Sequence, residues 1–105
     1  INDNGDGTFY TRIETYAHEN ADEISQTLFL EIWDEGRDGW VYVDDWEFST
    51  TKSENGGELY EYVVEMELDG CEVGESYRVR GLHMVRVGTK TESFSSMTDG
   101  VTLTD

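Results

Sequence analysis

The sequence predicts an all-β domain, an antiparallel β-sandwich of six to seven strands, and three observations support this. Large apolar residues recur at every second position in four separate runs. Glycine-containing turns separate the runs at intervals of about 8–12 residues, which is typical of sandwiches. The chain of 105 residues is long enough for one modest hydrophobic core. We therefore expect residues 1–105 to form a single module, and we expect the module to belong to a longer multidomain protein.

Three of the runs predict well-defined strands. In residues 59–68 the aromatic and aliphatic side chains fall on one face and the glutamates on the other, whereas a helix would scatter them. Residues 24–33 carry large apolar side chains on both faces, which indicates a central strand. In residues 77–87 one face is apolar and the other holds three arginines. Weaker strands are expected over residues 9–16 and 92–103.

The fourth run, residues 40–48, is less regular. Trp40, Tyr42 and Trp46 stand at alternate positions, but Asp44 interrupts them, so we expect a bulge near Asp44–Asp45. One helical turn is expected over residues 18–23. The predicted core consists of Ile24, Leu28, Leu30, Trp33, Tyr62, Val64, Met66, Tyr77, Val79 and Val85.

The formal net charge of −17 argues against nucleic acid and anionic lipid as partners, because both would be repelled. No apolar run approaches the length of a membrane span, so we expect no membrane insertion. The arginine row of Arg78, Arg80 and Arg86 is expected to pair with Asp45 and Glu47 on a neighbouring strand.

The single cysteine, Cys71, excludes a disulfide within the chain. No group around it would activate the thiol, so we expect a small apolar or turn residue.

The segment from Val73 to Arg80, Val-Gly-Glu-Ser-Tyr-Arg-Val-Arg, resembles the loop-to-strand junction of fibronectin type III and bacterial immunoglobulin-like surface modules. The resemblance implies that Tyr77 forms a tyrosine corner, in which the ring lies in the core and the hydroxyl bonds a nearby backbone group. It also implies that Trp33 is a structural core residue. The missing prolines and residues 40–60 depart from the family pattern.

Modules of this kind serve as spacers, adhesion units or accessory domains. The resemblance thus implies a non-catalytic, extracellular module, secreted or at a cell surface, bacterial in origin and monomeric within its parent chain. Its partner is expected to be a carbohydrate, a protein or none.

No enzyme constellation stands out. The two histidines, His18 and His83, have no serine, cysteine or aspartate pattern that suggests a triad. His83 alternates with apolar residues of its strand, and we interpret it as a structural histidine.

The N-terminal segment is a candidate calcium site. Asn2, Asn4 and Asp6 supply side-chain oxygens at alternate positions before a glycine, and Ca²⁺ needs six to eight oxygen ligands. The alternative is an ordinary turn that leads into a strand, with no cofactor. A second acidic group comprises Asp34, Glu35, Asp38, Asp44 and Asp45.

Carbohydrate is the other candidate ligand. If the face with Trp40, Tyr42 and Trp46 were exposed, its rings would form a platform for sugars, flanked by Asp44 and Asp45. The alternative is that these rings are part of the core, because aromatic side chains supply much of the apolar area of this chain.

Overall fold

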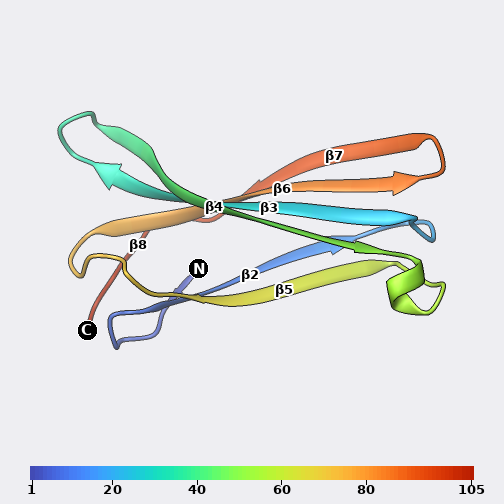
Figure 1. Ribbon diagram of the computed structural model, residues 1–105. Coiled ribbons are helices and arrows are strands. Elements are labelled where there is room, and N and C mark those ends of the chain that lie inside the picture. The colour runs from blue at the N-terminus through green and yellow to red at the C-terminus, as the bar shows by residue number, and fades with distance from the viewer.

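The computed structural model describes residues 1–105, and it folds them into two antiparallel sheets (Figure 1). The smaller sheet has the order β1-β2-β5; in the larger sheet β4, β3, β6 and β7 follow one another, and β8 also pairs with β6. The strands are β1 (Asn2–Asp3), β2 (Phe9–Tyr16), β3 (Glu23–Asp34), β4 (Gly39–Thr51), β5 (Glu61–Leu68), β6 (Ser76–Val87), β7 (Lys90–Met97) and β8 (Val101–Thr102). The antiparallel β-sandwich that the sequence predicts is therefore confirmed.

The alternating runs of the sequence became strands close to their expected limits. β2 coincides with the expected range, and β3 lies between β4 and β6, as its two apolar faces indicated. The last expected strand divides into β7 and β8 around Asp99–Gly100. The helical turn expected over residues 18–23 is wrong: that segment is irregular, and the one helical element is a 3-10 turn, η1 (Ser53–Asn55).

The core lies between the two sheets and forms two clusters. The larger is built around Phe9, Leu28 and Tyr77, and the smaller around Ile24 and Leu59. Most of the predicted core positions face this interior. Buried residues that the predicted core omitted include Phe9, Thr11, Ile13, Thr15, Ala21, Leu59, Leu68 and Leu103.

A β-bulge divides β4 into two parts. β3 pairs Leu30 with Asp44 but Glu31 with Tyr42, so Val43 is an extra residue without a partner. Residues paired directly across antiparallel strands point to the same face. The extra residue therefore reverses the alternation. Two side chains that strict alternation would place on the same face, one before Val43 and one after it, lie on opposite faces.

Two side-chain placements need correction. Trp33 pairs with Trp40 on the outer face of the larger sheet and is half-buried there, so it is not a core residue. Tyr60 precedes β5 and is exposed. The error at Trp33 comes from the family resemblance, whereas the error at Tyr60 comes from extending the alternation past the start of β5.

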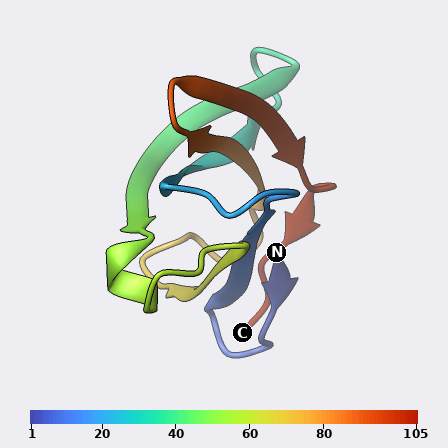
Figure 2. The ribbon, with the colours of Figure 1, turned by 90° about the vertical axis from the view of Figure 1, so that its right-hand side faces the viewer.

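The molecule is elongated, with principal extents of 45 × 27 × 18 Å. Figure 2 shows that the larger sheet curves, so that β4 descends toward η1 and β5. The short strands β1 and β8 lie together on the opposite side in this view. The structure contains no helix with the length and apolar character needed to cross a membrane.

Candidate functional site

The outer face of the larger sheet carries a cluster of aromatic and cationic side chains, which we call the outer-face cluster: Trp33, Trp40, Tyr42, Glu31, Arg78 and Arg80. The rings of Trp33 and Trp40 meet edge to face, with 5.5 Å between centroids. The guanidinium of Arg78 lies 4.7 Å from the centre of the Trp40 ring, a cation–π distance. Trp40 is half-buried as a result.

The loop between β7 and β8 also touches Trp40. A Cβ atom on Gly100 would lie 2.6 Å from Cη2 of the indole, closer than any normal contact. Only glycine permits the ring to lie against this backbone. Trp40 is thus held on one side by Arg78 and at its far end by Gly100.

Glu31 pairs with both arginines of this cluster and compensates part of their charge. Its carboxylate is 2.7 Å from Nε of Arg78 and 3.3 Å from Nε of Arg80, and its side chain is only 11% exposed. The predicted pairing of the arginine row with Asp45 and Glu47 is wrong. β6 neighbours β3 and not β4, so the carboxylate comes from the central strand.

Tyr42 is the exposed aromatic residue of the cluster, at 57%. Its hydroxyl donates a hydrogen bond of 2.5 Å to Oδ2 of Asp45. This bond raises the pKa of Tyr42, because the phenol is stabilised in its protonated, donating form. Tyr42 and Asp45 together present a ring and a carboxylate to solvent, as a sugar site requires.

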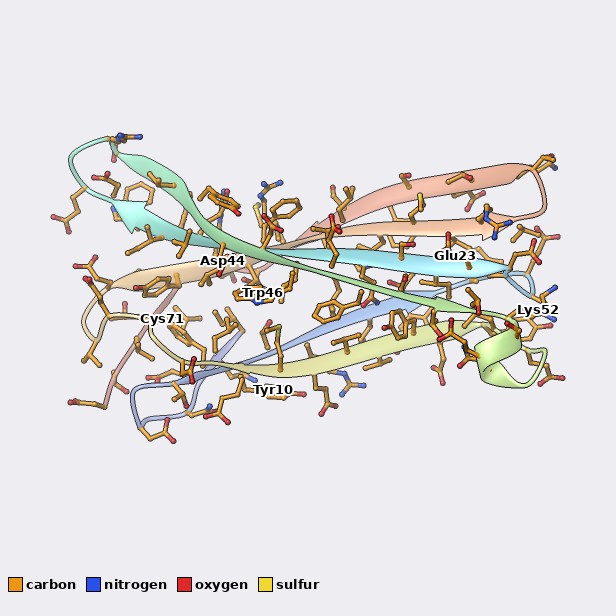
Figure 3. All side chains as sticks on the ribbon, in the orientation of Figure 1. Tyr10, Glu23, Asp44, Trp46, Lys52 and Cys71 are labelled. Atoms are coloured by element: carbon orange, nitrogen blue, oxygen red, sulfur yellow. The ribbon has the colours of Figure 1, made fainter.

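Trp46 does not share this face. It pairs with Leu28 and packs against the larger core cluster, and Figure 3 shows it between the two sheets. The prediction that Trp40, Tyr42 and Trp46 form one platform is therefore wrong in its geometry. The bulge at Val43 is the reason, since it turns Trp40 and Tyr42 outward and leaves Trp46 inside.

The predicted calcium segment forms a compact turn between β1 and β2. Asn2 lies in β1, Asn4 donates to Oγ1 of Thr8 at 3.0 Å, and Oδ1 of Asp6 accepts from the backbone N–H of Thr8 at 3.1 Å. Nowhere in the structure do three or more histidine, cysteine, aspartate or glutamate side chains converge as a metal-binding group. Calcium binding here stays a prediction.

Asp3, in β1, ties this turn to the C-terminal segment. Its carboxylate accepts hydrogen bonds from the hydroxyl of Thr104 and from the backbone N–H of Gly5. These bonds lower the pKa of Asp3, the Thr104 hydroxyl contributing most. The carboxylate oxygens of Asp3 and Asp6 therefore already accept hydrogen bonds from groups of the protein.

His83 lies inside the sandwich in a hydrogen-bonded chain of polar side chains. Its Nδ1 is 2.7 Å from Oγ1 of Thr15, and its Nε2 is 2.8 Å from Oγ of Ser96. Gln26 donates through Nε2 to Oγ1 of Thr15 at 2.7 Å. Burial lowers the pKa of His83 and favours the neutral ring. The prediction of a structural histidine is confirmed in its burial, at 3% exposure.

Tyr77 makes the hydrogen bond of a tyrosine corner. Its ring is buried against Phe9, and its hydroxyl accepts from the backbone N–H of Glu72 at 2.8 Å. Cys71, beside it, is half-buried and packs against the core, and burial raises the pKa of its thiol. A protonated, inert thiol fits the filler role expected of it.

The sequence left the members of the outer-face cluster apart from one another. Trp33 was assigned to the core, and Glu31 and Arg78 were not linked to the aromatic residues. The sequence does contain one signal of this cluster. Glu31 and Trp33 are two positions apart in one strand, as are Arg78 and Arg80 in another, so each pair lies on one face of its strand. Using it requires knowing that these strands are neighbours.

Comparisons with protein-family models, with curated proteins and with solved structures found no match to this chain.

Proposed function

We propose that this chain is a non-catalytic module of the fibronectin type III kind, which serves as a spacer or an adhesion or accessory unit of a secreted or cell-surface protein. The observation that supports this proposal most strongly is the way the strands are distributed between the two sheets. The smaller sheet has the order β1-β2-β5 and the larger begins with β4-β3-β6-β7. This is a two-sheet Greek-key arrangement of seven consecutive strands, as in immunoglobulin-like sandwiches.

Two further observations support the same proposal. Tyr77 stands at the start of β6 and bonds the backbone of Glu72, five residues upstream, as a tyrosine corner does. The elongated shape of 45 × 27 × 18 Å suits a unit that separates other domains. The extracellular location rests on the resemblance of the Val73–Arg80 segment to surface modules of that kind.

A thermal-shift screen of the chain against glycans, divalent cations and candidate extracellular proteins tests the spacer role. A spacer is expected to keep one melting temperature throughout. A saturable rise with one compound, removed by a substitution on the surface, would replace the spacer role with a binding role.

Carbohydrate binding is the second candidate, and the exposure of Tyr42 beside Trp40 favours it. An exposed ring next to a carboxylate can stack against a sugar while Asp45 accepts from its hydroxyls. The Tyr42→Ala variant is then expected to lose glycan binding and to keep its unfolding midpoint. The matched control is Tyr60→Ala, since Tyr60 is similarly exposed and lies away from the cluster. Equal glycan binding by both variants would exclude this site.

A further inference from the structure

The outer face of the larger sheet is apolar well beyond the outer-face cluster. Residues paired directly across antiparallel strands share a face, and the pairing places Phe29, Leu82, Met84 and Met97 on the same side as the cluster. Leu82 is 47% exposed and Met97 is 61% exposed. The solvent side of an antiparallel sheet is ordinarily polar, so this face carries more exposed apolar surface than the fold requires.

The charge of this face differs from that of the rest of the molecule. It holds four carboxylates and three guanidinium groups, those of Glu23, Glu31, Asp45, Glu47, Arg78, Arg80 and Arg86. Its net charge is therefore −1, whereas the whole chain carries −17. Arginine, methionine and aromatic side chains are enriched in the buried centres of protein interfaces, and lysine is depleted there. The face has this composition, and no lysine lies on it.

The side chains of the face are arranged in rows that change character across β3. Asp45 of β4, Phe29 of β3 and Arg80 of β6 form one row. In the neighbouring row, Tyr42 lies on the β4 side and Arg78 on the β6 side. Apart from the two glutamates of β3 itself, the carboxylates of this face thus lie on one side of β3 and the guanidinium groups on the other.

Arg80 retains donors that the chain does not use. Its Nε lies 3.3 Å from Glu31, which also pairs with Arg78, and its side chain is 43% exposed. Its guanidinium lies 4.9 Å from the centre of the Phe29 ring, over the central strand. A guanidinium offers several N–H donors in a planar fork. A second carboxylate from outside the chain can therefore bind Arg80 while Glu31 stays in place.

A second copy of the same face supplies this carboxylate. Two sheets pack face to face with their strands nearly aligned, at about 30°. If a two-fold axis runs along β3 between the faces, β6 of each copy lies over β4 of the other and the rows stay in register. Arg80 of each copy then faces Asp45 of the other, and Arg78 faces Tyr42.

The charges select this arrangement over the other simple one. An axis perpendicular to the strands would set β6 over β6 and bring the arginine rows together, which like charges oppose. With the axis along β3, only Glu23 and Glu31 face their own counterparts. Both already pair with arginines of their own copy.

We propose that two copies of this chain associate through the outer faces of their larger sheets, around a two-fold axis along β3. The contact covers Phe29 and Leu82 and places Arg80 opposite Asp45 twice. As a partner for the adhesion role, a second copy rests on the proposed function, but the contact itself depends only on the face. It competes with carbohydrate for Tyr42.

The net charge of −17 makes this association depend on salt. The outer face of the smaller sheet, with Glu14, Glu61, Glu65 and Glu67, lies on the opposite side of the molecule (Figure 1). The smallest extent of the molecule is 18 Å, about two Debye lengths at physiological ionic strength. We therefore expect a monomer in dilute, low-salt solution, and a dissociation constant at least about tenfold lower in 500 mM NaCl than in 50 mM NaCl.

Sedimentation equilibrium of the full chain measures the association, and charge reversal tests its geometry. Arg80→Asp sets carboxylate against carboxylate at both symmetric positions, and Asp45→Arg sets guanidinium against guanidinium. Each variant alone is expected to associate at least about tenfold more weakly than the wild type. An equimolar mixture of the two is expected to recover the wild-type affinity, because each acidic side chain then faces a basic one. A damaged surface would not be rescued in this way.

Matched variants control for the change in net charge. Arg12→Asp, on the outer face of the smaller sheet, changes the charge as much as Arg80→Asp and is expected to keep the wild-type dissociation constant. If a charge-reversed variant does not fold, Leu82→Lys replaces it. Leu82 faces Glu47 of the other copy in the same register, so this variant is expected to associate about threefold more tightly. Its control is Val73→Lys, at an exposed valine between β5 and β6.

Three results would overturn the proposal. The chain could remain monomeric up to about millimolar concentration in 500 mM NaCl. The mixture of the two charge-reversed variants could associate no better than either alone. Saturable binding of a glycan at Tyr42 without any self-association would assign the face to carbohydrate instead. None of these results bears on the spacer role, which the thermal-shift screen tests separately.

Discussion

The hydroxyl of Tyr77 holds the turn between β5 and β6 to the start of β6. Tyr77→Phe removes the acceptor of the Glu72 N–H and keeps the ring packed against Phe9. We expect the free energy of unfolding to fall by about 1 kcal/mol, because a partly buried donor loses its partner. Urea denaturation at neutral pH measures this.

The control for this prediction is Tyr60→Phe, since Tyr60 is 50% exposed and no hydrogen bond to its hydroxyl is formed. That variant is expected to unfold at the wild-type urea concentration. An unchanged midpoint for Tyr77→Phe would show that the tyrosine corner contributes nothing to stability.

His83 makes stability depend on pH. Burial lowers the pKa of His83 in the folded state, so the unfolded chain binds a proton more readily, near the ordinary value of about 6.5. The free energy of unfolding is therefore expected to fall as the pH decreases from about 7.5 to about 5.5. Denaturation curves over this range measure the slope.

His83→Gln keeps hydrogen-bonding capacity but does not titrate, and its slope over the same pH range is expected to be smaller. His18 is exposed and lies outside the hydrogen-bonded chain of His83, so His18→Gln serves as the matched histidine substitution. Identical slopes for the wild type and His83→Gln would show that another group causes the pH dependence.

Gly81 shows how closely the surroundings of His83 are packed. A Cβ atom on Gly81 would lie 2.7 Å from Oγ of Ser96 and 2.9 Å from Nε2 of His83. A glycine in mid-strand, which would ordinarily weaken a sheet, is here the condition for the hydrogen bond between these two side chains. In the sequence Gly81 is only one position of the alternating strand, because its neighbours Ser96 and His83 are brought beside it by the fold.

At the scale of the element, the bulge in β4 decides which tryptophan is structural. Trp46 packs against the larger core cluster, and Trp46→Ala is expected to lower the free energy of unfolding by roughly 2–4 kcal/mol through a lost contact area and a cavity. Tyr42 is exposed, and Tyr42→Ala is expected to cost less than about 0.5 kcal/mol. Guanidinium denaturation of both variants checks the order; the reverse order would contradict the register around Val43.

The elements were predictable to the extent that their side chains alternate without interruption. The alternation is regular in β2 and along most of β3 and β6, and the faces expected for most residues of these strands and of β5 are confirmed. β4 was the exception. The sequence placed a bulge near Asp44–Asp45, and the unpaired residue is the adjacent Val43. A bulge at any position between Tyr42 and Trp46 puts these two rings on opposite faces, and the prediction of one platform did not follow this consequence.

Strand neighbours were harder to predict than strands. The arginine row was assigned to acidic residues of β4 because the fibronectin-like order was expected to make those two strands neighbours, and charge complementarity agreed with this, but several acidic segments satisfy the charge condition. Charge complementarity alone therefore could not select Glu31 on β3 as the partner of Arg78 and Arg80. The outer-face cluster depends on this choice, and for that reason the sequence did not reveal it.

At the scale of the whole molecule, the net charge of −17 opposes the compact state through repulsion. Raising NaCl from about 20 mM to about 500 mM is expected to raise the melting temperature by about 5 °C, because salt screens these charges. Tetramethylammonium chloride at equal ionic strength should act similarly if screening is the cause. A rise that occurs only with NaCl would contradict screening and indicate bound cations.

The predicted calcium site has its own measurement. Millimolar Ca²⁺ at constant ionic strength is expected to raise the melting temperature if the β1–β2 turn binds the ion, and Asp6→Ala should remove the rise. Asp99→Ala, an exposed aspartate in another loop, is the control. An equal rise in melting temperature in both variants would show that calcium acts only by screening the negative charges.

The extra residue in β4 also concerns how such a domain can change over time. Because Val43 reverses the phase of the strand, removing one residue near it would restore simple alternation and exchange the solvent-facing and interior side chains between it and the hairpin tip. A change of length would then rebuild the outer-face cluster in one step, without any substitution among its members. Insertions and deletions in this hairpin are therefore a direct route by which one framework could acquire different surfaces.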